Sequence, residues 1–184
     1  MRHRFQIAWF AAFAAFASPA EAATDALIVQ VPQISSAAAQ QLGEACVAFA
    51  AKANTATAVA VVDPAGRLLY FFARQGASPT APKTAELKAV TAARWGRATR
   101  QLFEQVKKGN AESLWLGDFP QPGGLPIIQD GHTLGAIGVA GPGGNDEKCA
   151  MEAIQAVFGN SVQTGRPVGA GAAARDVPGG GAAP

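Results

Sequence analysis

The 184 residues carry a formal net charge of only +2, and 49% of them are hydrophobic. No run of arginine or lysine residues is present, so the sequence gives no support for electrostatic binding of nucleic acid or of an anionic membrane surface. The length fits one domain with room for a hydrophobic core.

Residues 1–22 have the pattern of a secretory signal peptide. A basic start precedes an apolar run over residues 7–17, and small residues stand where a signal peptidase reads the chain before Ala22. The apolar run is short for a bilayer span, although an uncleaved anchor is the alternative. We predict cleavage after Ala22, a linker at 23–33, and a mature chain, residues 23–184, that is periplasmic or secreted.

Apolar periodicity, caps and turn residues predict alternating groups of helices and strands. The predicted elements, in chain order, are a helix from Ser35 or Ser36 to 52, strands 57–62 and 67–73, helices 83–95 and 99–108, strands 125–128 and 134–140, and a helix to 158. The strand at 67–73 is apolar on both faces. It should therefore be covered on both sides, by helices or by another subunit.

The segment from 122 to 158 predicts a β-hairpin, a glycine-rich loop and a helix. Asp130-Gly131 favours a type I′ turn, and Asn145 can cap the last helix. Glycines that precede a helix N-terminus can present backbone N–H groups to an anion. The candidates for this role are Gly123, Gly124, Gly143 and Gly144, and a purely conformational role is the alternative.

Cys46 and Cys149 each lie on an apolar face, one in the first predicted helix and one in the last. An even cysteine count in an exported protein favours a disulfide, which would close a loop of about 100 residues. Two buried free thiols are the alternative.

The predicted mature chain has one histidine, His132, which excludes a multi-histidine metal site within one subunit. His132 is a candidate axial ligand for haem iron, and Tyr70, the only tyrosine, is a second. A surface turn residue and a core tyrosine are the corresponding structural interpretations.

Lys88 and Arg94 could supply positive charge to a carboxylate, such as a haem propionate or a small hydroxy acid; a solvated helix face is the alternative. Phosphate-binding loops and nucleophile-elbow motifs are absent from the sequence. The sequence thus displays no evident catalytic constellation. This argues against an enzyme, although haem can supply its own reactivity.

Five segments carry a family resemblance, at 59–69, 88–99, 122–126, 130–141 and 146–150. Together they resemble the GlcG/HbpS-like family of haem-binding proteins, and the resemblance spans about residues 34–159. It implies an α+β fold of the profilin-like kind, with three α/β/α layers around an antiparallel sheet of about five strands. It also implies homo-oligomers. Residues 160–184, rich in glycine, alanine and proline, are predicted to be a disordered tail.

Within this family some relatives bind haem and one is linked to extracellular redox sensing, whereas others are encoded beside glycolate-oxidation genes or fused to cobalamin-pathway enzymes. The first hypothesis is therefore an exported haem-binding protein for haem handling or redox sensing, with His132 or Tyr70 as ligand. The alternative is a periplasmic accessory module that binds a small carboxylate or a partner enzyme, without haem.

Overall fold

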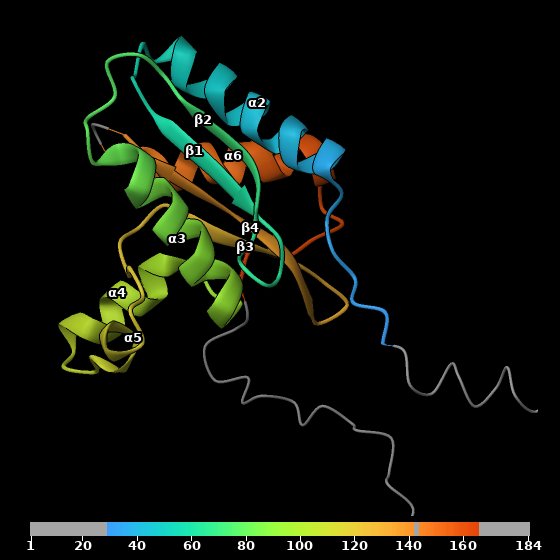
Figure 1. Cartoon of the computed structure of the whole chain (residues 1–184), viewed down its shortest axis with the longest axis vertical. Coiled ribbons are helices and arrows are strands. Elements are labelled where there is room, and N and C mark those ends of the chain that lie inside the picture. The colour runs from blue at the N-terminus through green and yellow to red at the C-terminus, as the bar shows by residue number, and fades with distance from the viewer. Residues whose placement is uncertain (1–28, 142–143, 166–184) are drawn as a thin grey trace, which may run out of the picture. The chain divides into compact units, whose positions relative to one another are not determined.

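Figure 1 shows the computed structural model, which describes residues 29–141 and 144–165. The predicted signal peptide, Gly143 and residues 166–184 of the predicted tail lie outside the described residues. Among the helices that the structure describes, none is long and apolar enough to cross a membrane.

The described residues form one antiparallel sheet with the strand order β2-β1-β4-β3. The strands are β1 (Ala58–Val62), β2 (Leu68–Ala73), β3 (Gly124–Gln129) and β4 (His132–Ala140). Asp130 and Gly131 both have positive φ, at 49° and 77°, which confirms the type I′ turn between β3 and β4. The sheet has four strands in this part of the chain, one fewer than expected. Beyond the last helix, Gln163, which was placed in the tail, pairs with Ile128 on the outer edge of β3.

Helices cover both faces of the sheet, which gives the predicted α/β/α layers (Figure 1). They are α2 (Ser36–Lys52), α3 (Ala81–Trp95), α4 (Thr99–Lys107), α5 (Glu112–Trp115) and α6 (Asp146–Phe158). Helices α2 and α6 pack on one face and α3 on the other. As predicted, Ser35 caps α2, because its hydroxyl accepts a hydrogen bond from the N–H of Ala38.

The two faces of the sheet are packed with side chains of different size. Toward α2 and α6 the core holds large aliphatic residues, including Leu42, Ile127 and Ile137. Toward α3 it holds mainly alanines, and a Cβ added to Gly138 would collide with backbone atoms of Ala85 and Ala89. Helix α3 therefore lies unusually close to β4, and small residues are required on both sides of this contact.

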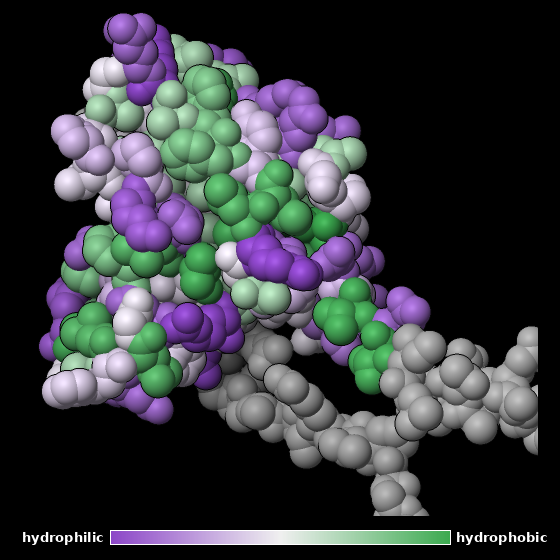
Figure 2. All heavy atoms as spheres, viewed as in Figure 1, coloured by the Kyte–Doolittle hydropathy of each residue, from purple (hydrophilic) through white to green (hydrophobic). Residues whose placement is uncertain are grey.

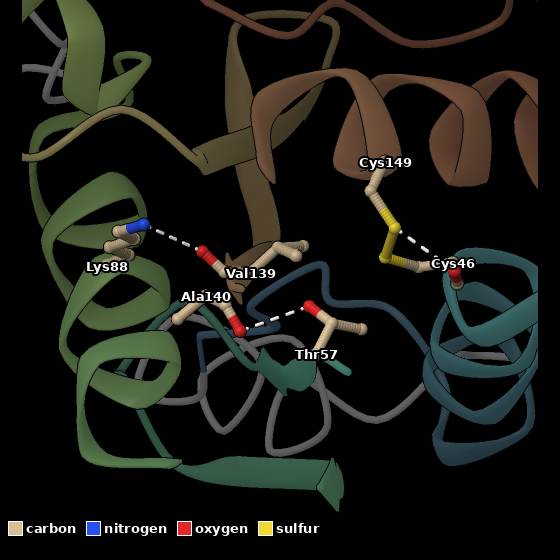
Figure 3. Close-up of a disulfide and its surroundings, with 6 residues drawn as sticks. All are labelled: Cys46, Thr57, Lys88, Val139, Ala140 and Cys149. Carbon is tan, nitrogen blue, oxygen red and sulfur yellow. Dashed lines mark hydrogen bonds between the residues drawn. A yellow bond between two sulfur atoms is a disulfide. The ribbon is translucent and has the colours of Figure 1, made fainter. Parts of the chain in front are cut away.

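A disulfide joins Cys46 of α2 to Cys149 of α6, with a Cα–Cα distance of 5.1 Å (Figure 3). Both residues are almost fully buried in the core on this face. The bridge therefore links the two helices that pack side by side, and it confirms the predicted pairing.

The edge strand β2 is only partly covered by the rest of the chain. The side chain of Tyr70 packs against the core on the α2 side, but the side chains of Leu68 and Phe71 are 51% and 42% exposed. Figure 2 shows apolar side chains gathered along the course that β2 follows in Figure 1. The chain's own helices thus leave part of this apolar strand in contact with solvent.

The turn between β1 and β2 is organised by the buried carboxylate of Asp63. Its Oδ1 accepts hydrogen bonds from the N–H groups of Ala65 and Arg67, both at 2.9 Å, and its Oδ2 accepts one from Arg67 Nε at 2.6 Å. Burial by itself would raise the pKa of Asp63. The hydrogen bonds from Arg67 and Ala65 outweigh burial and hold the pKa of Asp63 below its ordinary value.

We expect replacement of both cysteines, Cys46→Ala with Cys149→Ala, to lower the free energy of unfolding by about 2–5 kcal/mol, because the open chain has more conformational freedom when unfolded. Urea unfolding measures this loss. A reductant should produce a similar loss in the wild-type protein and none in the double variant. Equal stability of all forms would contradict the structural role of the bridge.

Asp63→Ala should lower the free energy of unfolding by about 1–3 kcal/mol at pH 7, because the hydrogen bonds from the Ala65 and Arg67 N–H groups to a charged acceptor are lost. The folded-state pKa of Asp63 is depressed, so its contribution is present above its unfolded pKa of about 4 and is lost as the pH falls through the folded-state pKa. The stability gap between wild type and variant, measured by urea unfolding, should therefore narrow on acidification to pH 3. A constant gap would contradict this assignment.

Candidate functional site

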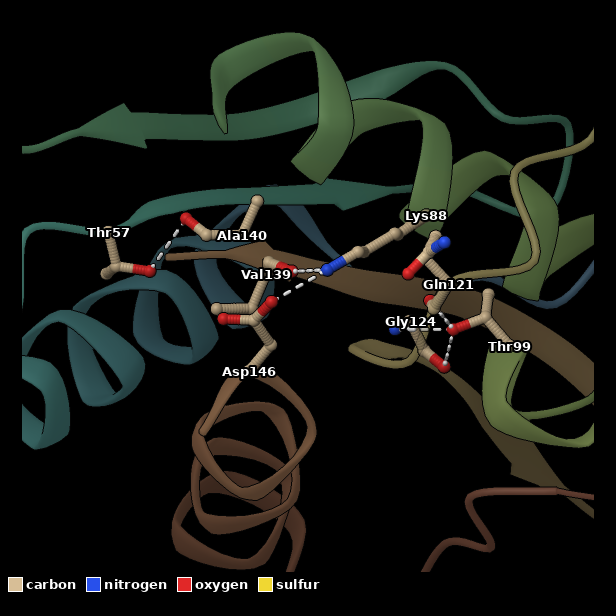
Figure 4. A network of polar contacts seen from close by, with 8 residues as sticks. All are labelled: Thr57, Lys88, Thr99, Gln121, Gly124, Val139, Ala140 and Asp146. Carbon is tan, nitrogen blue, oxygen red and sulfur yellow. Dashed lines mark hydrogen bonds and ion pairs between the residues drawn. The ribbon is translucent and has the colours of Figure 1, made fainter. Parts of the chain in front are cut away.

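Lys88 is a buried lysine that makes polar contacts with two other secondary-structure elements. It lies on α3 with only 4% of its surface exposed. Its Nζ donates to the carbonyl oxygen of Val139 in β4 at 2.8 Å and to Asp146 Oδ2, at the start of α6, at 2.7 Å (Figure 4). The interpretation of Lys88 as part of a solvated helix face is therefore wrong.

Gly123 and Gly124 lie directly against this lysine, as Figure 4 shows for Gly124. A Cβ on Gly123 would lie 2.7 Å from Asp146 Cβ and 3.0 Å from Lys88 Nζ. The N–H of Gly124 donates to Thr99 Oγ1, which itself donates to the carbonyl oxygen of Gln121. The N–H of Gly124 is thus already paired. Both glycines allow the start of β3, at residues 123 and 124, to pack closely against α3 and α6.

An open hollow of about 420 Å³ lies beside the Lys88–Asp146 pair. Three hydroxyl-bearing residues, Ser78, Thr80 and Thr84, line it together with the pair and the backbone at Gly141. Its lining therefore combines polar and apolar surface, and it contains one buried cation and one carboxylate.

Arg94 does not join Lys88 in a common site. Its Nη1 donates to Asp118 Oδ1 at 2.6 Å and to the carbonyl oxygen of Leu116. The indole N–H of Trp95 donates to the other oxygen of Asp118. The buried carboxylate of Asp118 thereby fixes the loop after α5, and Arg94 and Trp95 anchor that loop to the end of α3.

Tyr70 lies on the opposite face of the sheet from α3. It pairs with Val61, and its ring occupies the space that Gly43 of α2 leaves open. Burial, and next the carboxylate of Glu44, raise the pKa of the Tyr70 hydroxyl. The phenolate form that ligates ferric haem is therefore disfavoured at this position.

His132 is the first residue of β4, next to the hairpin turn, and it is exposed. Gly144 has a φ of +72° and open space around its Cα, whereas Gly143 lies outside the described residues. The candidate residues thus form separate locations: Lys88 with Gly123 and Gly124, and His132, Tyr70 and Arg94 each elsewhere. Within the residues that the structure describes, no group of three or more histidine, cysteine or acidic side chains is placed to hold a metal ion.

Comparison with known sequences assigns the chain to a family. The model for the haem-degrading protein HbpS-like family matches residues 34–155, so the chain belongs to the GlcG/HbpS-like family. Protein GlcG of Escherichia coli K12 is 32% identical over 106 residues, which cover 55% of this chain and 79% of GlcG. A 15.0 kDa protein from the dhaT–dhaS intergenic region of Citrobacter freundii is 31% identical over 117 residues, which cover 61% of this chain and 82% of that protein.

Solved structures agree with this assignment. A double mutant of Streptomyces reticuli HbpS has a TM-score of 0.67 at 30% identity, covering 80% of this chain and 98% of that one. The PduOC:heme complex has a TM-score of 0.66 at 27% identity, and the match covers 73% of this chain and 99% of that one. The observed α+β architecture is therefore that of the family.

Gly123→Ala should destabilise the fold more than Gly144→Ala, although both glycines have positive φ. At Gly144 only the left-handed backbone is penalised, by about 1–2 kcal/mol. At Gly123 the added methyl group must also displace Asp146 or the carbonyl oxygen of Val139, which adds about 1–3 kcal/mol. Urea midpoints of the two variants measure the difference. Equal losses would mean that close packing is not what Gly123 provides.

Proposed function

We propose that this chain is an exported haem-binding protein that acts in haem handling or redox sensing. The observation that carries the proposal is the family match over residues 34–155, together with the similarity of fold to a haem complex. The pattern of residues 1–22 supports export. We propose binding rather than a protein-based catalytic step, because the sequence has no evident catalytic constellation.

His132 is the ligand that the geometry favours. Its exposed imidazole can approach a porphyrin without rearrangement of the core, whereas Tyr70 is packed against α2 and its pKa is raised. Imidazole is also a common axial ligand of haem iron. When bound, haem would supply the redox chemistry, and the chain would hold and orient it.

Other residues at the same end of the sheet fit a porphyrin. Both hairpin turns lie at this end, because Val62, at the end of β1, pairs with Leu68 of β2 and Ala136 of β4 (Figure 1). Leu68 offers an exposed apolar surface, and the side chain of Arg67 is 73% exposed and could pair with a propionate. An apolar surface and a cation at the β1–β2 turn, and an imidazole at the β3–β4 turn, are thus available at the same end of the sheet, where a second copy of the chain could complete the site.

Hemin titration of the mature chain, residues 23–184, tests the proposal, because this form keeps every described helix and strand. We expect a new Soret band that saturates near one haem per chain, is lost in His132→Ala and remains in Tyr70→Phe. Loss in Tyr70→Phe with survival in His132→Ala would transfer the ligand role to Tyr70. A titration without saturation would refute haem binding.

A further inference from the structure

We propose that the hollow beside Lys88 and Asp146 binds a small, neutral vicinal diol, such as a short polyol. The proposal concerns a different place and a different ligand from the haem site. It starts from the polar atoms that remain unpaired around the hollow.

Lys88 and Asp146 each keep one hydrogen-bonding position free within the described part of the chain. The ammonium group has three protons, of which Val139 and Asp146 take two. Asp146 uses Oδ2 for the lysine, and no hydrogen bond in the described structure involves its Oδ1. Both residues line the hollow, and their Nζ and Oδ2 atoms lie 2.7 Å apart, so a charged donor and a charged acceptor are neighbours in its lining.

The charge of this pair argues against an anionic ligand. The side chains of Lys88 and Asp146 are 5% and 16% exposed, and their charges compensate each other at 2.7 Å. A ligand carboxylate would meet the repulsion of Asp146 and no net positive charge, so its desolvation would not be offset. Among the lining residues that the structure describes, Lys88 is the only one with a cationic side chain. A neutral ligand avoids this cost.

A vicinal diol matches the spacing of the ion pair itself. Lys88 Nζ and Asp146 Oδ2 lie 2.7 Å apart, and the two oxygens of a gauche diol are separated by about the same distance. One hydroxyl can therefore accept from Lys88 while its neighbour donates to the carboxylate of Asp146. Thr84 adds a third hydroxyl in the lining, and its side chain has no hydrogen bond within the described structure. Among the described lining residues there is no aromatic ring for a sugar to stack on, which favours a short open-chain ligand.

The test compares two isomers of equal composition, 1,2-propanediol and 1,3-propanediol. Each is titrated into ¹⁵N-labelled residues 23–184 without haem, and amide shifts are followed by NMR. We expect 1,2-propanediol to produce saturable shifts confined to the amides of Gly76, Thr84 and Gly141. The 1,3-isomer and sodium glycolate should produce no saturable shift. Because haem is absent, the result does not depend on whether His132 ligates haem.

Substitutions in the hollow separate binding from a purely structural role of the ion pair. Thr84→Val keeps the shape of the side chain but removes its hydroxyl, and should weaken 1,2-propanediol binding roughly fivefold. Lys88→Met should weaken it more than tenfold where the variant folds. Lys83→Met removes an exposed lysine of the same helix outside the hollow and should leave the affinity unchanged.

Three results would overturn the proposal. Equal, linear responses to both propanediols would indicate a general cosolvent effect. Saturation by glycolate alone would indicate an anion site. Unchanged affinity in Thr84→Val together with shifts far from the hollow would place the diol elsewhere.

Discussion

The ammonium group of Lys88 is held between a strand carbonyl and the first carboxylate of a helix, inside the protein. A charge in such a place is stable only when its partners are well placed, and removal of one partner from a buried pair is strongly destabilising. Lys88 therefore fixes the relative positions of α3, the end of β4 and the start of α6. The start of α6 in turn leads to Cys149, whose disulfide fixes α2. Helices on both faces of the sheet are thus positioned from one buried charge.

This constraint explains why glycine and small residues gather around it. The start of β3 passes so close to Lys88 and Asp146 that neither Gly123 nor Gly124 has room for a side chain. Helix α3 must also approach β4 closely for the lysine to reach the strand carbonyl, and the alanine layer permits that approach. Two of the four glycines that the sequence suggested as an anion cradle, Gly123 and Gly124, are therefore explained by packing around a cation that is already paired.

Local chemistry made most of the fold predictable, whereas long-range pairing hid the candidate site. Asp130-Gly131 and Ser35 act through atoms a few residues away, so the turn and the cap follow from sequence. The family motifs supplied the layers, and the number of strands was overestimated by one within the described residues. The partner of Lys88 lies 58 positions along the chain, and the loop carboxylate that binds Arg94 lies 24 positions away. A lysine on a helix that carries both polar and apolar residues is predicted to be exposed to solvent unless such a distant carboxylate is known. Its flanking alanines and Thr91, buried on the same face of α3, were the available signal.

The two proposed sites lie at opposite ends of one strand. His132 begins β4, and Val139, which binds Lys88, stands seven positions later. At a rise of about 3.3 Å per residue, these positions are about 23 Å apart. Ligands at the two sites therefore cannot touch, and any influence of one on the other must pass through β4 or the helices packed on it. Val139 and Ile137 are fully buried in the core on the α2 and α6 face, so this strand is among the least deformable parts of the fold. The structure thus favours two independent sites on a rigid sheet, in which haem and a small diol could be bound without competition.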